Sequence, residues 1–209
     1  MIHEISAIAV ALLMGLAIFH YCILTFKGKK QPTLATWILF VLATNIAFIT
    51  NLFSAHTAIL KTLIGNAANV ADVPTTWAVL ITILVVNKKN GWKNKFNGFD
   101  LSCIIATLVV LIIWAITQKH LATNLVVQII LTIGYFPTLK NLWRAKGNPE
   151  SLWVWIAILA ASVLGLYLAI ESGELTAKIY SWRAVILVSV LLILIIRANL
   201  RAKKLKEAC

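Results

Sequence analysis

Long apolar runs separated by short polar segments account for most of the chain. A helix needs roughly 20 apolar residues to cross the hydrocarbon core of a bilayer, and seven runs are long enough: Ile5–Phe26, Thr36–Phe53, Ala58–Val86, Leu101–Thr117, Leu121–Trp143, Leu152–Ile170 and Ile179–Ile196. The third run is long for one crossing and too short for two, so we expect one tilted or kinked helix that bends at Pro74. The pattern predicts an all-α integral membrane protein with seven transmembrane helices.

The composition indicates the same class of protein. Apolar residues make up 61% of the 209 residues and charged residues only 12%, against about 45–50% and about 25% in soluble domains. These values exclude a soluble enzyme, a disordered chain and a collagen-like fibre. The three cysteines lie far apart at no metal-binding spacing, and the sequence has no nucleophile motif and no phosphate-binding loop. We expect no enzymatic activity, no metal and no cofactor.

The basic residues alternate from one side of the predicted bilayer to the other. Fifteen of the 19 Lys and Arg residues lie at or just after the ends of the first, third and fifth runs or in the C-terminal tail, and the other four are Lys61, Lys119, Lys178 and Arg183. Cytoplasmic loops carry the excess of Lys and Arg, so we predict an N-terminus outside the cell and a C-terminus in the cytoplasm. The lipid bilayer then accounts for the net charge of +12, and we expect no nucleic-acid partner.

Two parts of the chain repeat a similar pattern. The first and fifth runs end in Gly15…His20-Tyr21…Phe26-Lys27-Gly28-Lys29 and Gly134-Tyr135…Trp143-Arg144-Ala145-Lys146, and the next helices start at Pro32-Thr33-Leu34-Ala35-Thr36-Trp37 and Pro149-Glu150-Ser151-Leu152-Trp153. The two copies are about 115 residues apart and face the same way across the membrane. This predicts a 3+1+3 parallel repeat, an arrangement found in transporters, with a three-helix bundle at 1–87, a connector with the fourth helix at 88–120, a second bundle at 121–197 and a basic cytoplasmic tail at 198–209.

The end of the fifth run carries a resemblance to known families. The stretch Gly134-Tyr135-Phe136-Pro137-Thr138-Leu139-Lys140-Asn141-Leu142-Trp143, with Ser151 fourteen residues after Pro137, resembles a PQ-loop motif in which Thr138 stands in place of the glutamine. The whole chain resembles a group of bacterial seven-helix proteins similar to PQ-loop and SWEET-like transporters. This resemblance implies a bacterial inner (plasma) membrane location, a hinge at Pro137 and transport of a small polar solute.

Polar residues in the third run form a stripe. Setting 100° per residue, Thr62, Asn66, Asn69, Asp72 and Thr76 share an arc of about 120° on a helix. Such a face suits a cavity wall, where Asn66 and Asn69 bind a polar solute and Asp72 takes a proton or a cation. The same residues are also suited to bonding neighbouring helices together. Pro74 offers a bend point, and so a hinge, in both cases.

Other candidate residues are spread over several runs. Asn45 and Gln128 are candidates for the cavity wall, Trp77 and Trp155 for stacking on a ligand, and His20 for relaying protons. Arg183 lies near the outer end of the last run, where Glu171 or Glu174 is a candidate partner.

The sequence leaves three functions open. The favoured one is a transporter of a small polar solute in which two three-helix bundles alternate access to a central site. The alternatives are a membrane receptor that does not transport and a structural or lipid-interacting membrane subunit. Association of several copies into a homo-oligomer is open as well.

Overall fold

The computed structural model describes residues 2–30, 32–54, 58–90, 98–144 and 150–207. They form helices α1 (Ile2–Phe26), α2 (Leu34–Ser54), α3 (Ile59–Gly65), α4 (Ala67–Asn90), α5 (Gly98–Thr117), α6 (His120–Arg144), α7 (Leu152–Ser172) and α8 (Leu175–Glu207). Six of them, α1, α2, α4, α6, α7 and α8, are long and apolar enough to cross a membrane. In α5 the shorter stretch Ile104–Thr117 is apolar. The prediction of an all-helical protein is confirmed for the described residues, and six helices of this length and apolarity are consistent with a multi-pass membrane protein. The predicted count of seven spans is not confirmed, because α5 is not among these six.

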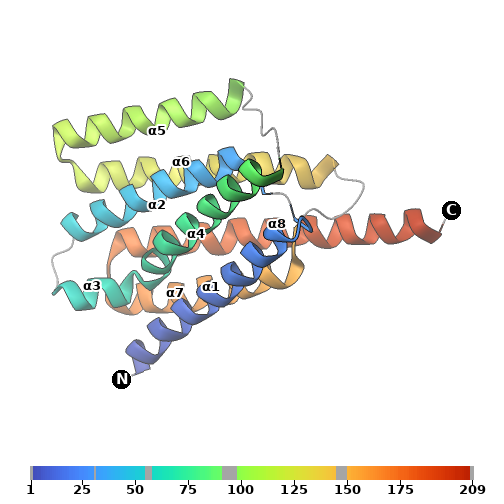
Figure 1. Cartoon of the computed structure of the whole chain (residues 1–209). Coiled ribbons are helices and arrows are strands. Elements are labelled where there is room, and N and C mark those ends of the chain that lie inside the picture. The colour runs from blue at the N-terminus through green and yellow to red at the C-terminus, as the bar shows by residue number, and fades with distance from the viewer. Residues whose placement is uncertain (1, 31, 55–57, 91–97, 145–149, 208–209) are drawn as a thin grey trace.

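The six long helices form a closed ring. Helix α4 packs between α1 and α2, and α8 packs between α6 and α7. We call α1, α2 and α4 the first triplet and α6, α7 and α8 the second triplet. The triplets meet where α1 packs against α7 and α2 packs against α6. Helix α5 lies outside the ring against α2 and α6, and α3 packs on α7 (Figure 1).

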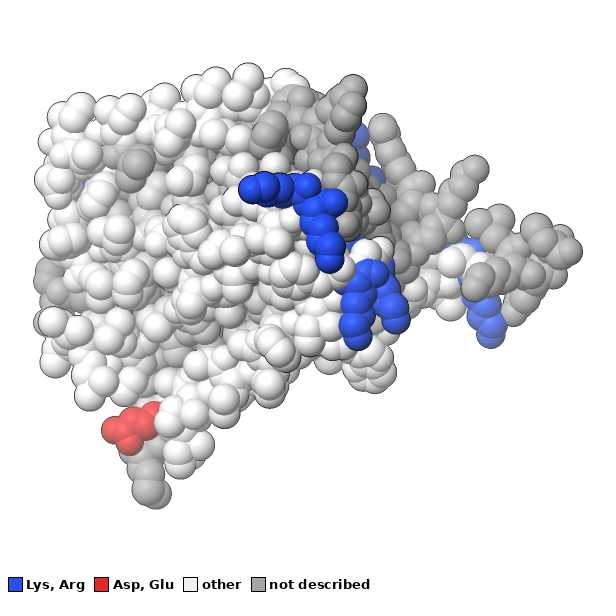
Figure 2. Space-filling model, viewed as in Figure 1, with Lys and Arg blue, Asp and Glu red and all other residues white. Residues whose placement is uncertain are grey.

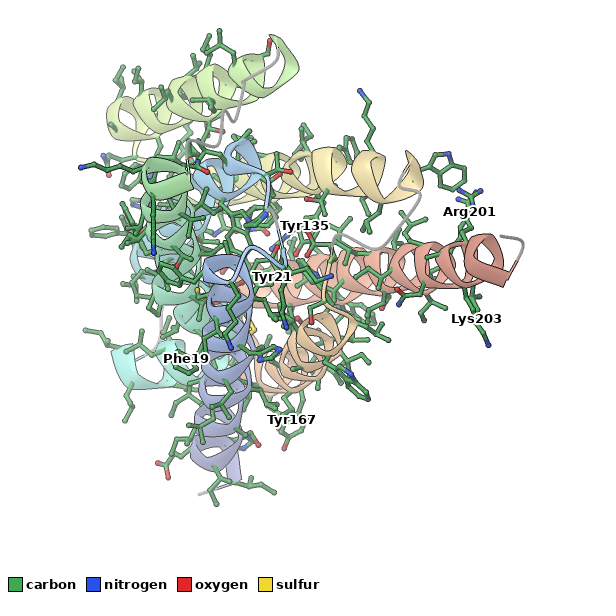
Figure 3. All side chains as sticks on the ribbon, turned by 45° about the vertical axis from the view of Figure 1, so that its right-hand side comes forward. Phe19, Tyr21, Tyr135, Tyr167, Arg201 and Lys203 are labelled. Carbon is green, nitrogen blue, oxygen red and sulfur yellow. The ribbon has the colours of Figure 1, made fainter. Side chains whose placement is uncertain are left out.

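Apolar side chains point both into the ring and away from it. Tyr21, Leu39 and Leu191 are fully buried, whereas Phe19 on the outer face of α1 is 66% exposed. Figure 3 shows Tyr21 and Tyr135 inside the bundle, and Phe19 and Tyr167 at its outside. A helix that is apolar all round is typical of a membrane span, because lipid tails cover the side that the protein leaves free.

Two glycines allow close contact between helices of different triplets. A Cβ atom on Gly165 of α7 would lie 2.7 Å from the Cβ atom of Ala68 on α4, and one on Gly134 of α6 would lie 2.9 Å from Cε1 of Phe40 on α2. Small residues let helix backbones approach in this way inside membranes. These contacts therefore help to fix the distance between the triplets.

The third apolar run is two helices rather than one. The chain leaves helical geometry at Asn66, where φ is −106° and ψ is 26°, between α3 and α4. A side chain at Gly65 would overlap Ser172 of α7, so this close approach accounts for a glycine where the first helix ends. Pro74 lies inside α4, so the interruption is eight residues before the proline at which we expected the bend.

Basic side chains gather at one end of the molecule, and the acidic side chains seen in the same view lie at the opposite end (Figure 2). At this end, which we call the basic end, α1, α4 and α6 terminate and α2 and α7 begin. Helix α8 continues past the ring there and carries Arg201 and Lys203 (Figure 3). The opposite end, where α1 begins and α7 meets α8, is the N-terminal end. Which end faces the cytoplasm stays a prediction from the charge distribution.

Candidate functional site

A small cavity lies at the centre of the ring. It has a volume of about 40 Å³, room for a few water molecules, and every helix of both triplets contributes to its wall. Most of the wall is apolar or aromatic. Asp72 on α4 is the acidic residue of this wall and Arg183 on α8 is its basic residue. Charged side chains inside a membrane are costly and mark functional pathways, so this cavity is the candidate site.

Tyr180 on α8 joins the two charged residues. Its hydroxyl donates a hydrogen bond to Oδ2 of Asp72, with 2.5 Å between the oxygens. The guanidinium carbon of Arg183 lies 4.7 Å from the centre of the Tyr180 ring, a cation–π distance. Tyr180 and Arg183 are neighbours on one face of α8 because they are three residues apart. A carboxyl group of the first triplet and a guanidinium of the second thus share one tyrosine.

A buried chain of amide side chains holds Arg183 in place. Its Nε donates to Oε1 of Gln128 at 3.0 Å, and Nε2 of Gln128 donates to Oδ1 of Asn124 at 3.1 Å. Asn124 in turn donates to the carbonyl oxygen of Ala47 and the hydroxyl of Thr50 on α2, both at 3.1 Å. Gln128 therefore belongs to the site as a support for Arg183.

The expected pairing of Arg183 with Glu171 or Glu174 is corrected by this network. Arg183 lies nine residues after Glu174, about 13 Å along a helix at a rise of about 1.5 Å per residue. Its partners are Gln128 and Tyr180, which lie at its own depth in the bundle. Arg183 therefore lies deeper in the bundle than Glu171 and Glu174, which are at the N-terminal end.

The polar stripe of the third run divides into two parts. Asp72 and Thr76 line the cavity. Asn66 donates to Oδ1 of Asn69 at 3.3 Å, and Asn69 donates to the carbonyl oxygen of Thr44 on α2 at 3.2 Å. The Thr44 and Thr76 hydroxyls are 3.3 Å apart. Asn69 thus bonds α4 to α2, as the structural alternative predicts, and Asn66 supports Asn69, while Oδ1 of Asn66 is buried without a hydrogen-bond partner.

The remaining candidates fall inside and outside the site. Trp155 lines the cavity. Asn45 donates to the carbonyl oxygen of Val41 in its own helix at 2.7 Å. His20 is exposed on α1, and Trp77, 45% exposed, turns away from the cavity that its neighbour Thr76 lines. Of the two predicted hinges, Pro74 is exposed on α4 and Pro137 lies in α6, where its side chain is outside the described residues.

An aromatic layer, which the sequence reasoning missed as a group, forms part of the cavity wall, because Trp37, Phe40, Tyr135 and Trp155 line the cavity. Ring centres follow one another at 5.9 Å from Tyr21 to Trp37, 5.6 Å to Phe40, 4.9 Å to Tyr135 and 6.4 Å to Trp155. The five rings come from α1, α2, α6 and α7, so both triplets contribute. The tyrosines and tryptophans near the starts and ends of predicted spans were a signal, but interfacial belts give the same signal.

The aromatic layer ends at a buried carboxyl group that the sequence reasoning also missed. Glu150, just before α7, is 7% exposed. The Tyr21 hydroxyl donates to its Oε2 at 3.0 Å and to its Oε1 at 3.3 Å, and Nε1 of Trp155 donates to Oε2 at 3.0 Å. Nζ of Lys30 donates to the backbone oxygen of Glu150 at 2.6 Å. Glu150 is thus held by both triplets.

Known proteins add no constraint on the site. No protein-family model matches the chain, and no curated protein matches it. The resemblance to PQ-loop and SWEET-like proteins therefore stays a prediction from the residues around Pro137. Within the described part of the chain, no group of three or more His, Cys, Asp or Glu side chains is placed to hold a metal ion.

Proposed function

We propose that this protein is a membrane transporter for a small polar solute, which alternates access to the central cavity between the two ends of the ring. The observation that carries the proposal is the Asp72–Tyr180–Arg183 group, in which opposite charges from the two triplets line one central cavity. Charged side chains placed in this way can bind a polar solute, because their contacts replace those that the solute makes with water outside the membrane. Binding sites at the junction of two repeated bundles are typical of secondary transporters.

The pattern of helix contacts supports the 3+1+3 repeat on which the proposal rests. In each triplet the third helix packs between the first and the second. If the second triplet is a copy of the first, α6, α7 and α8 correspond to α1, α2 and α4. Under this correspondence the α1–α7 contact becomes the α2–α6 contact, and the α4–α8 contact maps onto itself. This is the contact pattern of two parallel copies related by a pseudo-two-fold axis, with α5 as the connector outside the ring. Such an axis lets the bundles rock against each other.

The arrangement also supports a closed state. Four of the five rings of the aromatic layer line the cavity, and the cavity itself admits only a few water molecules. A solute larger than water would enter after the triplets separate at one end. In this scheme Asp72 is the candidate coupling site, because a lone carboxyl group in a central cavity can exchange a proton or a cation with each side in turn.

Uptake into proteoliposomes tests the proposal. We would measure uptake of a panel of radiolabelled amino acids, sugars and small carboxylic acids with a pH gradient across the vesicle. Wild-type protein should take up at least one of them, Asp72→Asn should not, and Trp77→Leu, an outward-facing change on the same helix, should behave as wild type. Uptake that survives in Asp72→Asn would contradict the site, and no uptake of any panel member would contradict the transporter.

The size of the cavity favours one alternative. A cavity of about 40 Å³ is also suited to a membrane receptor or a structural subunit whose centre stays closed. In that case the buried polar network would only stabilise the bundle, as Asn69 does between α4 and α2. The same assay separates a transporter from both alternatives, because neither a receptor nor a structural subunit gives uptake.

A further inference from the structure

Glu150 holds the two triplets together at the basic end. Its carboxyl group accepts hydrogen bonds from Tyr21 of α1 and from Trp155 of α7, and its backbone oxygen accepts one from Lys30, which follows α1. Tyr21 is 129 residues away in the sequence. The contact therefore joins the first triplet to the second.

The position of Glu150 relates it to the cavity. Trp155 both bonds Glu150 and lines the cavity, and Tyr21 contacts Trp37, which lines the cavity as well. Glu150 does not itself line the cavity. The basic end cannot open between α1 and α7 without breaking the hydrogen bonds from Tyr21 and Lys30 to Glu150, because these two donors belong to the α1 side and Glu150 directly precedes α7.

We propose that Glu150 is a proton-binding latch at the basic end: the protonated carboxyl group stabilises the closed end, and the loss of the proton favours opening. The inference rests on the proposed function, since it assumes that the triplets separate. The ligand is a proton at the Glu150 carboxyl group, a site separate from Asp72.

The charges around Glu150 determine the direction of the effect. Burial raises the pKa of Glu150 above its ordinary value, while the hydrogen bonds from Trp155 and Tyr21 and the charge of Lys30 lower it by less. Burial lowers the pKa of Lys30, and the charge of Glu150 opposes this change. Among the residues that the structure describes, Tyr21 and Lys30 are the titratable or charged groups that act on Glu150.

The difference in the pKa of Glu150 between the closed and the open state determines which state a rise in pH favours. In an open state Glu150 faces water and has an ordinary pKa, so the closed state binds the proton more tightly. Proton binding therefore stabilises the closed state, and raising the pH through the raised pKa of the closed state favours opening. Ionised Glu150 is buried at a desolvation cost that exposure to water relieves.

Spin-label distances test the latch directly. Phe26 at the end of α1 and Trp153 at the start of α7 are both exposed, and they belong to the two helices that the contact joins. With Cys22, Cys103 and Cys209 replaced by alanine, nitroxides at Phe26→Cys and Trp153→Cys report their separation by double electron–electron resonance in nanodiscs. We expect one short distance at pH 5.5 and an additional longer one at pH 8.

Two variants and a control make the outcome decisive. Glu150→Gln, a neutral side chain of the same shape, should give the short distance at both pH values, whereas Glu171→Gln at the other end of α7 should behave as wild type. Tyr21→Phe removes a donor to the ionised carboxyl group, so it should enlarge the long-distance population at pH 8. A wild-type distance that ignores pH, or a Glu150→Gln protein that keeps the wild-type pH response, would overturn the latch.

Failure of the latch and failure of the proposed function remain distinguishable. The distance measurement needs no substrate, and the uptake assay needs no spin label. If uptake occurs but the distances ignore Glu150, the latch is wrong and the transporter stands. If the distances follow Glu150 but no solute is taken up, the latch stands as a conformational switch in a protein that does not transport.

Discussion

Two carboxyl groups inside the bundle have similar partners but different surroundings. Asp72 in the first triplet accepts a hydrogen bond from Tyr180 of the second, and Glu150 in the second accepts one from Tyr21 of the first. Asp72 shares a cavity with a guanidinium, whereas Glu150 is enclosed by an indole and a lysine that bonds its backbone.

The two carboxyl groups differ in which molecules they can contact. A carboxyl group that lines a cavity can contact a solute that enters it, while one whose oxygens are occupied by neighbouring donors can only respond through those donors. The same carboxyl–tyrosine contact between triplets thus suits binding at the cavity and closure at the basic end. Changing each group separately tests this division.

The largest expected effect is on uptake when Asp72 is changed. Asp72→Asn keeps the size of the side chain and removes its charge, so we expect uptake to fall at least about tenfold, the equivalent of 1.4 kcal/mol in binding. Glu150→Gln should instead take up as much solute as wild type at acidic pH, where wild-type Glu150 is protonated and equally neutral. Equal loss of uptake in both variants at every pH would contradict the separate roles of Asp72 in binding and Glu150 in closure.

The two tyrosine hydroxyls should affect stability by similar amounts. Tyr180→Phe and Tyr21→Phe each remove a buried hydrogen bond to a carboxyl group, and each should lower the free energy of unfolding by about 1.5–3 kcal/mol. Thermal unfolding in detergent measures both. A loss of uptake in Tyr180→Phe that Tyr21→Phe does not share would sharpen the distinction, and equal losses would remove it.

Stability should depend on pH through Glu150. Because its pKa is raised in the folded protein, its contribution to stability is fully present at acidic pH and is lost as the pH rises from the ordinary pKa through the raised one. Wild-type protein should therefore lose thermal stability relative to Glu150→Gln between acidic and neutral pH, by a few degrees at about 2–4 °C per kcal/mol. Glu171→Gln is the matched control, and a parallel pH response of wild type and Glu150→Gln would contradict the assignment.

The smallest effect is expected on the outer face of α4. Trp77→Leu should change the free energy of unfolding by no more than about 0.5 kcal/mol, because Trp77 points away from the cavity. Thermal unfolding and the uptake assay should both give values close to those of wild type. An uptake defect as large as that of Asp72→Asn would show that the functional site extends beyond the cavity.

Part of the site was predictable from the helical period alone. Asp72 and Thr76 were expected on one face of the third run and both reach the cavity, and Trp155 was expected to approach it. The outward directions of His20 and Trp77 were not predictable, because a membrane helix is apolar on both its lipid side and its protein side. The break at Asn66 follows Gly65, where a side chain would overlap Ser172, a residue distant in the sequence.

The sequence by itself determined where the apolar helices lie and at which helix ends the basic residues occur. Both follow from local properties: the length of an apolar run and the charges beside it. Only the tertiary structure decided which buried polar groups meet, since Asp72 and Tyr180 are 108 residues apart and Tyr21 and Glu150 are 129 apart. Those meetings depend on the order in which helices pack around the ring, and hydropathy along one helix carries no information about its neighbours.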